Sequence, residues 1–453
     1  MEPRSVSLTE AFRFWLKLGF ISFGGPTGQI AIMHQELVER RRWISENRFL
    51  HALNYCMLLP GPEATQLATY IGWMMHRTWG GIVAGGLFVL PSVFILIALS
   101  WIYMAYGGIV WVSGLFYGIK PAVVAIVLAA AHRIGSRALK NAWLWSIAAA
   151  AFVAIFALDA PFPAIVITAA AIGYLGGRYA PERFTAGSAH AAANKEYGPA
   201  IIDDDTPTPA HALFSWPKLW GYAAAGVALW AVAIGVLYGL DKTLFEMGWF
   251  FTKAALLTFG GAYAVLPYVY QGGVEHYGWL SATQMIDGLA LGETTPGPLI
   301  MVVAFVGFVG GWTKELFGAG ALAGAGIAGA LVATYFTFLP SFVFILVGAP
   351  FIETTHGKLE FTAPLTAITA AVVGVVLNLA IWFAIHTVFH EVRPVRGFGF
   401  SFEAPVPGSV DPWALALSVA AAIAIFRFKV GMIQTLGACC AAGIVLYLLG
   451  ALS

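Results

Sequence analysis

Long apolar runs follow one another along most of the chain, separated by short polar stretches. Because about 20 apolar residues in a helix cross the hydrocarbon core of a bilayer, these runs predict membrane-spanning helices. The expected fold class is therefore an all-α polytopic membrane protein. The uninterrupted runs cover residues 80–106, 108–131, 141–158, 161–178, 218–240, 318–351, 357–386, 411–426 and 430–452.

Two apolar stretches near the N-terminus are each interrupted by a short break rich in glycine and proline. The stretch 8–40 is broken by "FGG" at Phe23, and the stretch 49–77 by "PGP" at Pro60. Each arm would span roughly 20 to 25 Å as a helix, which is less than the ~30 Å hydrocarbon core. Broken helices or re-entrant hairpins are therefore expected, and the sequence leaves open which of the two they are.

The chain contains an internal repeat. At an offset of 236 residues, "FGG" at Phe23 aligns with "FGG" at Phe259, and "PGP" at Pro60 aligns with "PGP" at Pro296. About 14 of the 49 positions from 14 to 62 are identical at this offset, where ~3 to 4 are expected by chance. Further along, the register slips by about 13 residues and the "LPS" motifs that begin at positions 90 and 339 match.

The repeat predicts two homologous halves, each with two broken units followed by full transmembrane helices. We expect the first repeat at residues 1–180 and the second at residues 218–453. The segment 181–217 between them contains "DDDTPTP" and scattered small polar residues. Such a composition predicts a soluble polar linker.

Basic residues predict a cytoplasmic N-terminus. If each broken unit returns to its own side, the "RRR" at 40–42 and most other Lys and Arg residues of the first half share the side of the N-terminus. Lys and Arg concentrate in cytoplasmic loops. The span 218–240 then turns the second half over, and there the counterpart of "RRR" is "HYG" at 276–278. Related sequence with opposite charge bias indicates inverted-topology repeats.

The breaks predict an anion site. Gly25 and Gly61 are expected as N-caps, with Pro26 and Pro62 at the first helical position, so that the second arm of each unit begins at its break. Four such helix N-termini, each carrying roughly +0.5 charge and free backbone N–H groups, sum to about +2. A small oxyanion dianion is the ligand that fits this charge.

Polar side chains near the breaks are candidate ligands of that anion. Thr and Ser hydroxyls in membrane helices also bond their own backbone, glycine pairs also serve close packing, and lysine also snorkels to the interface. Asn54 either reaches the substrate or locks a helix pair. The candidates for substrate binding are Gly24, Gly25, Pro26, Thr27, Gln29, Asn54, Gly61, Pro62, Gly260, Gly261, Thr294, Thr295, Gly297, Pro298, Lys17 and Lys253, with Ser22, Thr65, Gln66 and Thr258 as further possible donors.

Two carboxylates lie inside apolar segments next to the breaks. Glu63 directly follows the first "PGP", and Glu293 precedes the second by three residues. Burial favours the neutral form of a carboxyl group, so such a residue can bind a proton near neutral pH. We expect Glu293, and after it Glu63, to couple transport to protons, while a capping role is the alternative.

Composition narrows the class of protein further. Charged residues make up 10% of the 453 residues, mean hydropathy is +0.79 and net charge is +1, so nothing indicates a nucleic-acid partner. The three cysteines have neither a disulfide nor a metal-ligand spacing, which predicts no metal and no cofactor. No nucleophile-base arrangement indicates an enzyme, and no catalytic residue is proposed.

Several long motifs resemble one known family. "FGGPTGQIAIMHQELVERRRWI", "ALNYCMLLPGPEATQLATYIGW", "LTFGGAYAVLPYV" and "LGETTPGPL" look like the chromate ion transporter family in its long form, and the likeness covers essentially the whole chain. The resemblance implies a bacterial inner-membrane protein that exports chromate with the proton motive force and confers chromate resistance. The positions that match the family motifs are Gly24, Gly25, Pro26, Gln29, Asn54, Pro60, Gly61, Pro62, Glu63, Gly260, Gly261, Glu293, Pro296, Gly297 and Pro298.

Three alternatives remain open at this stage. Sulfate has the charge of chromate and nearly its shape, so a carrier of sulfate or a related oxyanion, working in either direction, would need the same residues. A passive anion channel would share the helix ends but needs no titrating carboxylate, and a membrane enzyme is the third alternative. The expected partners are the anion, protons and the lipid bilayer, and the sequence leaves the oligomeric state open, a homodimer included.

Overall fold

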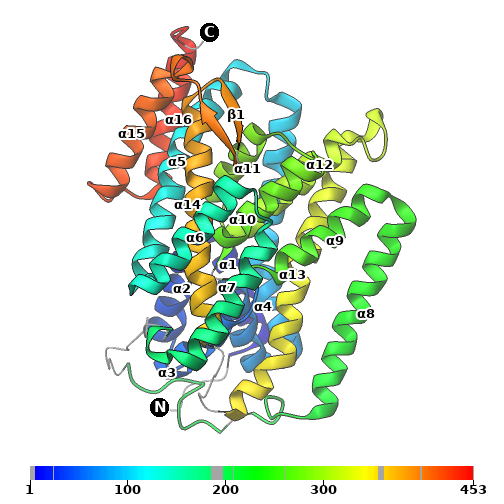
Figure 1. Ribbon diagram of the computed structural model, residues 1–453. Coiled ribbons are helices and arrows are strands. Elements are labelled where there is room, and N and C mark those ends of the chain that lie inside the picture. The colour runs from blue at the N-terminus through cyan, green and yellow to red at the C-terminus, as the bar shows by residue number, and fades with distance from the viewer. Residues whose placement is uncertain are drawn as a thin grey trace. The chain divides into compact units, whose positions relative to one another are not determined.

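The computed structural model describes residues 6–23, 25–184, 197–207, 209–259, 261–355, 362–397 and 400–451 (Figure 1). Most of them are helical, as the apolar runs predict. The α-helices are α1 (Leu8–Ile21), α2 (Gly25–His34), α3 (Glu46–Leu58), α4 (Glu63–Tyr106), α5 (Val110–Ala138), α6 (Ala142–Leu158), α7 (Phe162–Tyr179), α8 (Trp216–Leu240), α9 (Lys242–Leu256), α10 (Ala262–Tyr270), α11 (Ala282–Thr294), α12 (Val302–Thr313), α13 (Leu322–Thr355), α14 (Thr362–Val388), α15 (Pro412–Phe426) and α16 (Met432–Leu448).

Five helical segments of the described chain are long and apolar enough to cross a membrane. They are Glu63–Tyr106, Val112–Ala138, Trp216–Leu240, Ala319–Glu353 and Ala363–Val388. Further apolar helices of 10 to 17 residues include Ala142–Leu158 and Met432–Leu448. The chain is therefore a multi-pass membrane protein.

The chain folds into two compact units, and each of them takes segments from both halves of the sequence. The first unit consists of Met1–Ile97, Ser188–Ala262 and Thr295–Glu360. The second consists of Ala98–Gly187, Tyr263–Thr294 and Phe361–Ser453. Helix α4 begins in the first unit and ends in the second. All four breaks, at 23–26, 60–62, 259–262 and 295–298, belong to the first unit.

Close helix packing through small residues builds the first unit. In α12 and α13, a Cβ added to Gly307 would lie 2.3 Å from the carbonyl oxygen of Gly329, so only glycine allows this approach. Helix α4 is interrupted at His76 and Arg77, whose backbone dihedrals are not helical. Beyond this point the chain folds back, since a Cβ on Gly72 would lie 2.4 Å from the carbonyl oxygen of Gly80.

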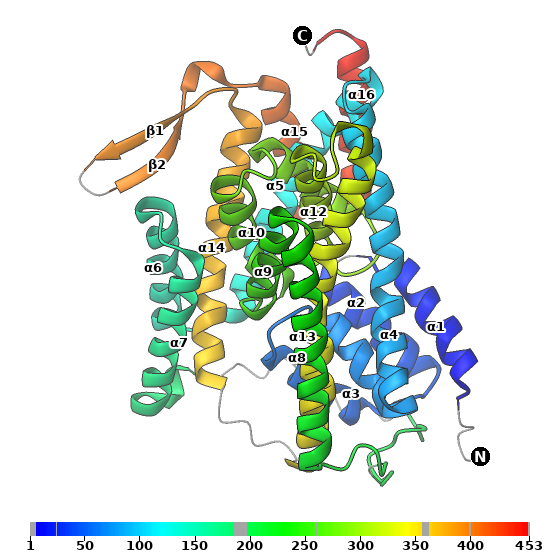
Figure 2. The same ribbon diagram turned by 90° about the vertical axis from the view of Figure 1, so that its right-hand side faces the viewer.

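The second unit combines α5–α7, α10, α11 and α14–α16 with a hairpin of two strands. Strands β1 (Val392–Gly397) and β2 (Phe400–Pro405) are antiparallel, with Val392 opposite Pro405. They follow α14 in the chain, and Figure 2 shows them above α6, which β2 contacts. The all-α prediction missed this hairpin because it rested on apolar runs of helix length. The strands are only six residues each, and β2 alternates apolar and polar residues at its start, as FSFE.

Part of the segment between the halves belongs to the first unit and packs against residues 43–47 there. The main chain of Ile202 pairs with residues 43–45: its N–H donates to Trp43 O, at 3.0 Å, and its carbonyl accepts from the Ser45 N–H, at 2.9 Å. Asp204 accepts hydrogen bonds from the side chains of Ser45 and Asn47, at 2.5 and 2.6 Å. We refer to the described residues of 197–215 as the docked segment. The prediction of a linker at 181–217 also covers residues 185–196 and 208, which lie outside the described chain.

Local backbone conformation repeats at the same offset as the sequence. A π-helical turn occurs at Gln35–Arg40 and again at Gln271–His276. Left-handed φ values recur at the corresponding positions Arg42 and Gly278, both +57°. The two halves therefore share local structure as well as sequence motifs.

Candidate anion-binding site

The four breaks of the first unit have one backbone conformation in common. Gly25, Gly61, Gly261 and Gly297 have φ values of +69°, +123°, +98° and +100°. Glycine adopts such angles without the steric cost that a side chain imposes. Each break therefore requires its glycine for the turn itself.

Helices begin at the breaks, as expected. Helix α2 starts at Gly25, one residue before the predicted first helical position at Pro26, and α10 starts at Ala262. Pro298 precedes a 3₁₀ turn, Leu299–Met301, that leads into α12. Helix α4 starts at Glu63, one residue later than the prediction that placed Pro62 at the first helical position. The arms after the breaks thus present helix N-termini there.

The breaks of the two halves are joined crosswise by backbone hydrogen bonds. The N–H of Gly61 donates to the carbonyl of Thr258, at 2.7 Å, and the N–H of Gly297 donates to the carbonyl of Ser22, at 2.8 Å. Thr258 and Gly297 lie 236 residues after Ser22 and Gly61, so the two bonds are equivalent under the repeat. The prediction that all backbone N–H groups at the breaks are free is therefore wrong for Gly61 and Gly297.

The serines of the two "LPS" motifs, Ser92 and Ser341, lie at the "PGP" breaks. A Cβ on Gly61 would lie 2.3 Å from Ser341 Oγ, and a Cβ on Gly297 would lie 2.8 Å from Ser92 Cβ. Each "PGP" glycine thus packs against the serine of the other half. Sequence reasoning detected the repeat of this motif but assigned no role to its serines.

Two glutamine side chains hold carbonyl groups of the breaks. Gln29 Nε2 donates to the carbonyl of Gly297, at 2.5 Å, and Gln66 Nε2 donates to that of Pro60, at 2.7 Å. Both side chains are buried. These bonds fix the orientation of each amide, because a flipped amide would set its oxygen against a carbonyl oxygen.

Several buried polar atoms around the breaks have no hydrogen-bond partner among the described residues. An unpaired polar group costs several kcal/mol in a membrane interior, so a cluster of them marks a place where a polar ligand or water is bound. Hydroxyl groups can donate to an oxyanion, and amide oxygens can accept from water or from a protonated ligand. The atoms are Gln29 Oε1, Thr65 Oγ1, Gln66 Oε1 and Ser92 Oγ.

Glu63 is the acidic residue at this site. Its carboxylate lies 3.9 Å from the position that a Cβ would take on Gly261, so it stands beside a break of the other half. No hydrogen bond or ion pair holds this carboxylate within the described part of the chain. An oxyanion at the breaks would therefore be close to a carboxyl group with no cation attached to it.

Comparison with known proteins identifies the family. The profile described as "Chromate transporter" matches residues 9–174 and 245–444. The chain belongs to the chromate transporter family. It is 34% identical over 382 residues to a "Chromate transport protein" of Pseudomonas aeruginosa, with 83% of this chain and 80% of that protein covered.

A second relative agrees with this assignment. The "Chromate transport protein" of Cupriavidus metallidurans is 31% identical over 380 residues, with 83% of both chains covered. No solved structure matches the chain. As a member of a transporter family, the protein is a transporter and not an enzyme, as the sequence predicts.

The remaining predicted ligands of this member of the chromate transporter family differ in burial and in bonding. Lys17, Lys253 and Asn54 have exposed side chains on α1, α9 and α3. Thr294 donates its hydroxyl to the carbonyl of Leu291, at 2.9 Å, so it bonds its own helix. Pro62, Thr295 and Pro298 are buried at the breaks, Pro26 is half-buried, and Gly24, Gly260 and the Thr27 side chain lie outside the described residues.

Glu293 belongs to the second unit. It is 6% exposed and accepts a hydrogen bond from the hydroxyl group of Tyr263. Arg133 of α5 is the cation that interacts with it electrostatically. Sequence reasoning identified Glu293 but had no signal for Tyr263 or Arg133, which are distant along the chain.

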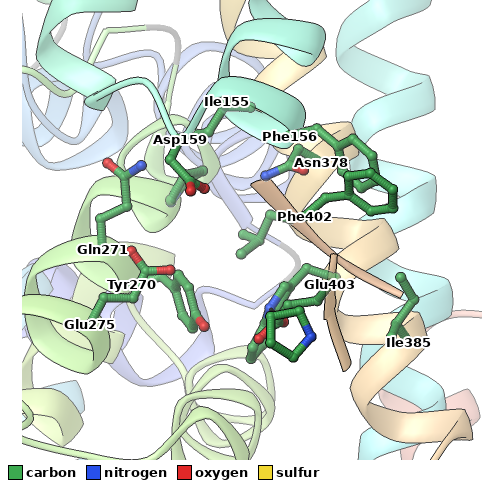
Figure 3. A pocket seen from close by; sticks show the side chains of 14 residues that line it. Ile155, Phe156, Asp159, Tyr270, Gln271, Glu275, Asn378, Ile385, Phe402 and Glu403 are labelled. Atoms are coloured by element: carbon green, nitrogen blue, oxygen red, sulfur yellow. Dashed lines mark hydrogen bonds between the residues drawn. The ribbon is translucent and has the colours of Figure 1, made fainter. Parts of the chain in front are cut away.

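A separate pocket in the second unit is unsuited to an anion. It has a volume of about 280 Å³, and Figure 3 shows Asp159, Glu275 and Glu403 around it. A hydrogen bond from His386 lowers the pKa of Glu403, in the hairpin, so this carboxylate is ionised at neutral pH. Negative charge on the lining repels an oxyanion. The four breaks therefore remain the candidate anion site.

Proposed function

We propose that this member of the chromate transporter family is a secondary carrier that exports chromate from the cytoplasm across the bacterial inner membrane, and so confers chromate resistance. The crossed contacts at the breaks, with their cluster of unpaired buried polar atoms, are the observation that carries the proposal. Chromate is a tetrahedral dianion, and the names of the two relatives give chromate as their transported substance.

In this proposal the anion binds among the four breaks. The first turns of α2 and α4 supply helix N-termini, which favour negative charge. Because the N–H groups of Gly61 and Gly297 are already bonded, the hydroxyl groups of Thr65 and Ser92 are the better donors. The remaining proposed ligands are Gly24, Gly25, Pro26, Thr27, Gln29, Pro62, Gly260, Gly261, Thr294, Thr295 and Pro298, and Asn54, Lys17 and Lys253 are proposed to attract the anion from exposed positions.

The proposal includes inverted-topology repeats at residues 1–180 and 218–453, joined by the linker 181–217, with the N-terminus in the cytoplasm. The equivalence of the Gly61–Thr258 and Gly297–Ser22 bonds supports this arrangement, because it gives each half the same role toward the other. The charge difference between "RRR" at 40–42 and "HYG" at 276–278 supports the opposite orientation of the halves.

Proton coupling is proposed at Glu63 and Glu293. An ionised Glu63 would repel an oxyanion next to Gly261, whereas a protonated one would not, so binding of the anion and of a proton are linked there. Moving one charge through 100 mV is worth about 2.3 kcal/mol. A membrane potential that is negative inside therefore drives the anion outward, even when a bound proton cancels part of its charge.

A counterflow experiment tests whether the protein is a carrier. Purified protein is reconstituted in proteoliposomes loaded with unlabelled chromate, and uptake of labelled chromate from outside is measured. A carrier exchanges the two and accumulates label transiently, and a passive channel does not. Loading with sulfate instead tests the sulfate-carrier alternative, since equal counterflow with sulfate would overturn a preference for chromate.

A further inference from the structure

Three residues from distant parts of the chain form a charged cluster inside the second unit. Asp287 of α11 is 3% exposed and accepts a hydrogen bond from the Tyr103 hydroxyl to its Oδ2 atom, at 2.8 Å. Lys120 of α5 places its Nζ atom 3.8 Å from Asp287 Oδ1. Oδ1 itself has no hydrogen-bond partner among the described residues. The ammonium group therefore attracts the carboxylate without being bonded to it.

The cluster lies within a membrane-spanning segment. Lys120 is part of the span Val112–Ala138, about 12 Å along the helix from its start. A charged side chain at such a depth is costly and faces a polar path or a partner. The Lys120 side chain is 24% exposed and that of Asp287 only 4%. Lys120 is thus the more accessible member of the pair.

The two oxygen atoms of Asp287 differ in what they can accept. Oδ2 already accepts the hydrogen of the Tyr103 hydroxyl group, so an added proton binds to Oδ1. A protonated Oδ1 is a donor, and it would then face the ammonium group of Lys120, which is a donor as well. Protonation of Asp287 therefore ends the attraction and frees Lys120 for another anion.

We propose that the Lys120–Asp287 pair is a second oxyanion site, in which Asp287 takes up a proton from water as the oxyanion takes its place beside Lys120. In the empty protein the carboxylate of Asp287 occupies the position of the anion. Removing the cation from a buried carboxylate leaves an uncompensated charge, and the proton removes that penalty. This inference rests on the proposed transport of chromate and adds residues that the sequence motifs do not contain.

Among the described residues, two groups act electrostatically on Asp287. Lys120 and Tyr103 are the titratable groups that act on it. Helices α14 and α16 also pack against α11, and no titratable group in their described parts acts on Asp287. Glu293 lies six residues further along α11, about 9 Å away along the helix axis. A purely structural ion pair between α5 and α11 is the competing explanation.

Equilibrium binding of labelled chromate to the purified full-length protein tests the inference. Stoichiometry and affinity are measured at neutral and at alkaline pH, where chromate itself is chiefly a dianion, in a Glu63→Gln background that removes the linkage at Glu63. The site at the breaks and the second site are fitted separately, and the affinities given below are those of the second site. We expect the parent protein to bind about tenfold more weakly at alkaline pH, within the usual range of coupling between sites. Asp287→Asn should bind as tightly at both pH values as the parent does at neutral pH.

Loss of the cation should have a different effect from loss of the acid. Lys120→Gln, and the double variant Lys120→Gln/Asp287→Asn, should bind about tenfold more weakly at both pH values, and Lys120→Arg should recover part of the affinity. As a control, Lys242→Gln breaks an exposed pair with Glu246 and should change nothing. Elution as a single peak in size-exclusion chromatography checks that each variant is folded.

Two results would overturn the inference while leaving chromate binding at the breaks intact. One is an unchanged pH dependence in Asp287→Asn. The other is full recovery of affinity in the double variant, which would make the pair structural. Absence of chromate binding in the wild-type protein itself would instead overturn the proposed function.

Discussion

Ser92 illustrates what a single buried hydroxyl group contributes to the site. It is 0% exposed, its Oγ atom has no partner among the described residues, and it packs against Gly297. If it only filled space, its removal would be neutral or stabilising, because an unpaired polar atom would leave the membrane interior. If it donates to the anion, its removal costs a hydrogen bond to a charged group.

We therefore expect Ser92→Ala to weaken chromate binding about tenfold without lowering thermal stability. Ser100→Ala is the matched control, because Ser100 lies on the same helix, is equally buried and also has an unpartnered hydroxyl group, but contacts no break glycine. Equilibrium binding of labelled chromate to both variants is the measurement. Equal affinities of the two variants would mean that Ser92 serves packing alone.

An ion pair joins elements of the first unit near the docked segment. Arg48 of α3 lies 2.8 Å from Glu353 of α13, whose other oxygen accepts a hydrogen bond from the Tyr70 hydroxyl. The residue that corresponds to Arg48 in the second half is Gln284, and its side chain contacts the sulfur of Met104, at 3.8 Å. Equivalent positions thus carry a buried charge pair in one half and a neutral contact in the other.

Breaking this pair should destabilise the fold. Arg48→Gln leaves Glu353 buried without its cation, and we expect a loss of about 3 kcal/mol in the free energy of unfolding, most of which the double variant Arg48→Gln/Glu353→Gln regains. Thermal unfolding in detergent measures the effect. Arg393→Gln breaks an exposed pair with Glu391 and should be neutral. A stable Arg48→Gln would show that the pair contributes little.

The docked segment should detach at low pH. His211 Nε2 lies 3.0 Å from the carbonyl of Trp73. Burial, followed by the charges of Arg77 and Lys218, lowers the pKa of His211 below its ordinary value of 6.5. The docked state therefore prefers neutral histidine: docking is fully stable above pH 6.5 and is lost as pH falls toward the lowered pKa.

Hydrogen exchange at the amides of Ile201 and Ile202 reports this docking, because both donate to the main chain at 42–43. Corrected for intrinsic rates, protection should fall on acidification in the wild-type protein and stay constant in His211→Gln. If the two proteins lose protection in parallel, another group controls the docking.

The elements of this fold were more predictable from sequence than the contacts between them. The run 141–158 corresponds to α6 (Ala142–Leu158), and the breaks at Phe23 and Pro60 occur where their glycines indicate. The boundary at His76 and Arg77 falls where the predicted stretch 49–77 ends and the run 80–106 begins, but no sequence pattern indicated that the chain folds back tightly there. Periodicity reports local structure only.

For the candidate site, too, the sequence predicted the residues at the breaks but not the residues that they contact. Gly61 and Gly297 follow from the repeat, but their partners Thr258 and Ser22 come from the other half, and no local pattern connects them. The pair of Lys120 and Asp287 was missed for the same reason, since these residues are 167 positions apart. Long-range pairing of polar groups is decided by tertiary packing, which a single sequence does not display.

On the scale of the whole molecule, we propose a proton-linked oxyanion carrier. The breaks of both halves belong to one compact unit, and helix α11 of the second unit carries two buried carboxylates, Asp287 and Glu293. Each of these carboxylates accepts a hydrogen bond from a tyrosine. The anion and the proton are thus proposed to bind to different residues, so one function can be removed while the other is retained.

Flux of labelled chromate in proteoliposomes under an imposed pH gradient tests this account most directly. The wild-type protein should move chromate against its own concentration gradient when the pH gradient is applied. Glu293→Gln should lose this uphill movement and still exchange chromate for chromate. Wild-type flux that follows only the chromate gradient and the membrane potential, or a Glu293→Gln variant with unaltered pH dependence, would contradict the account.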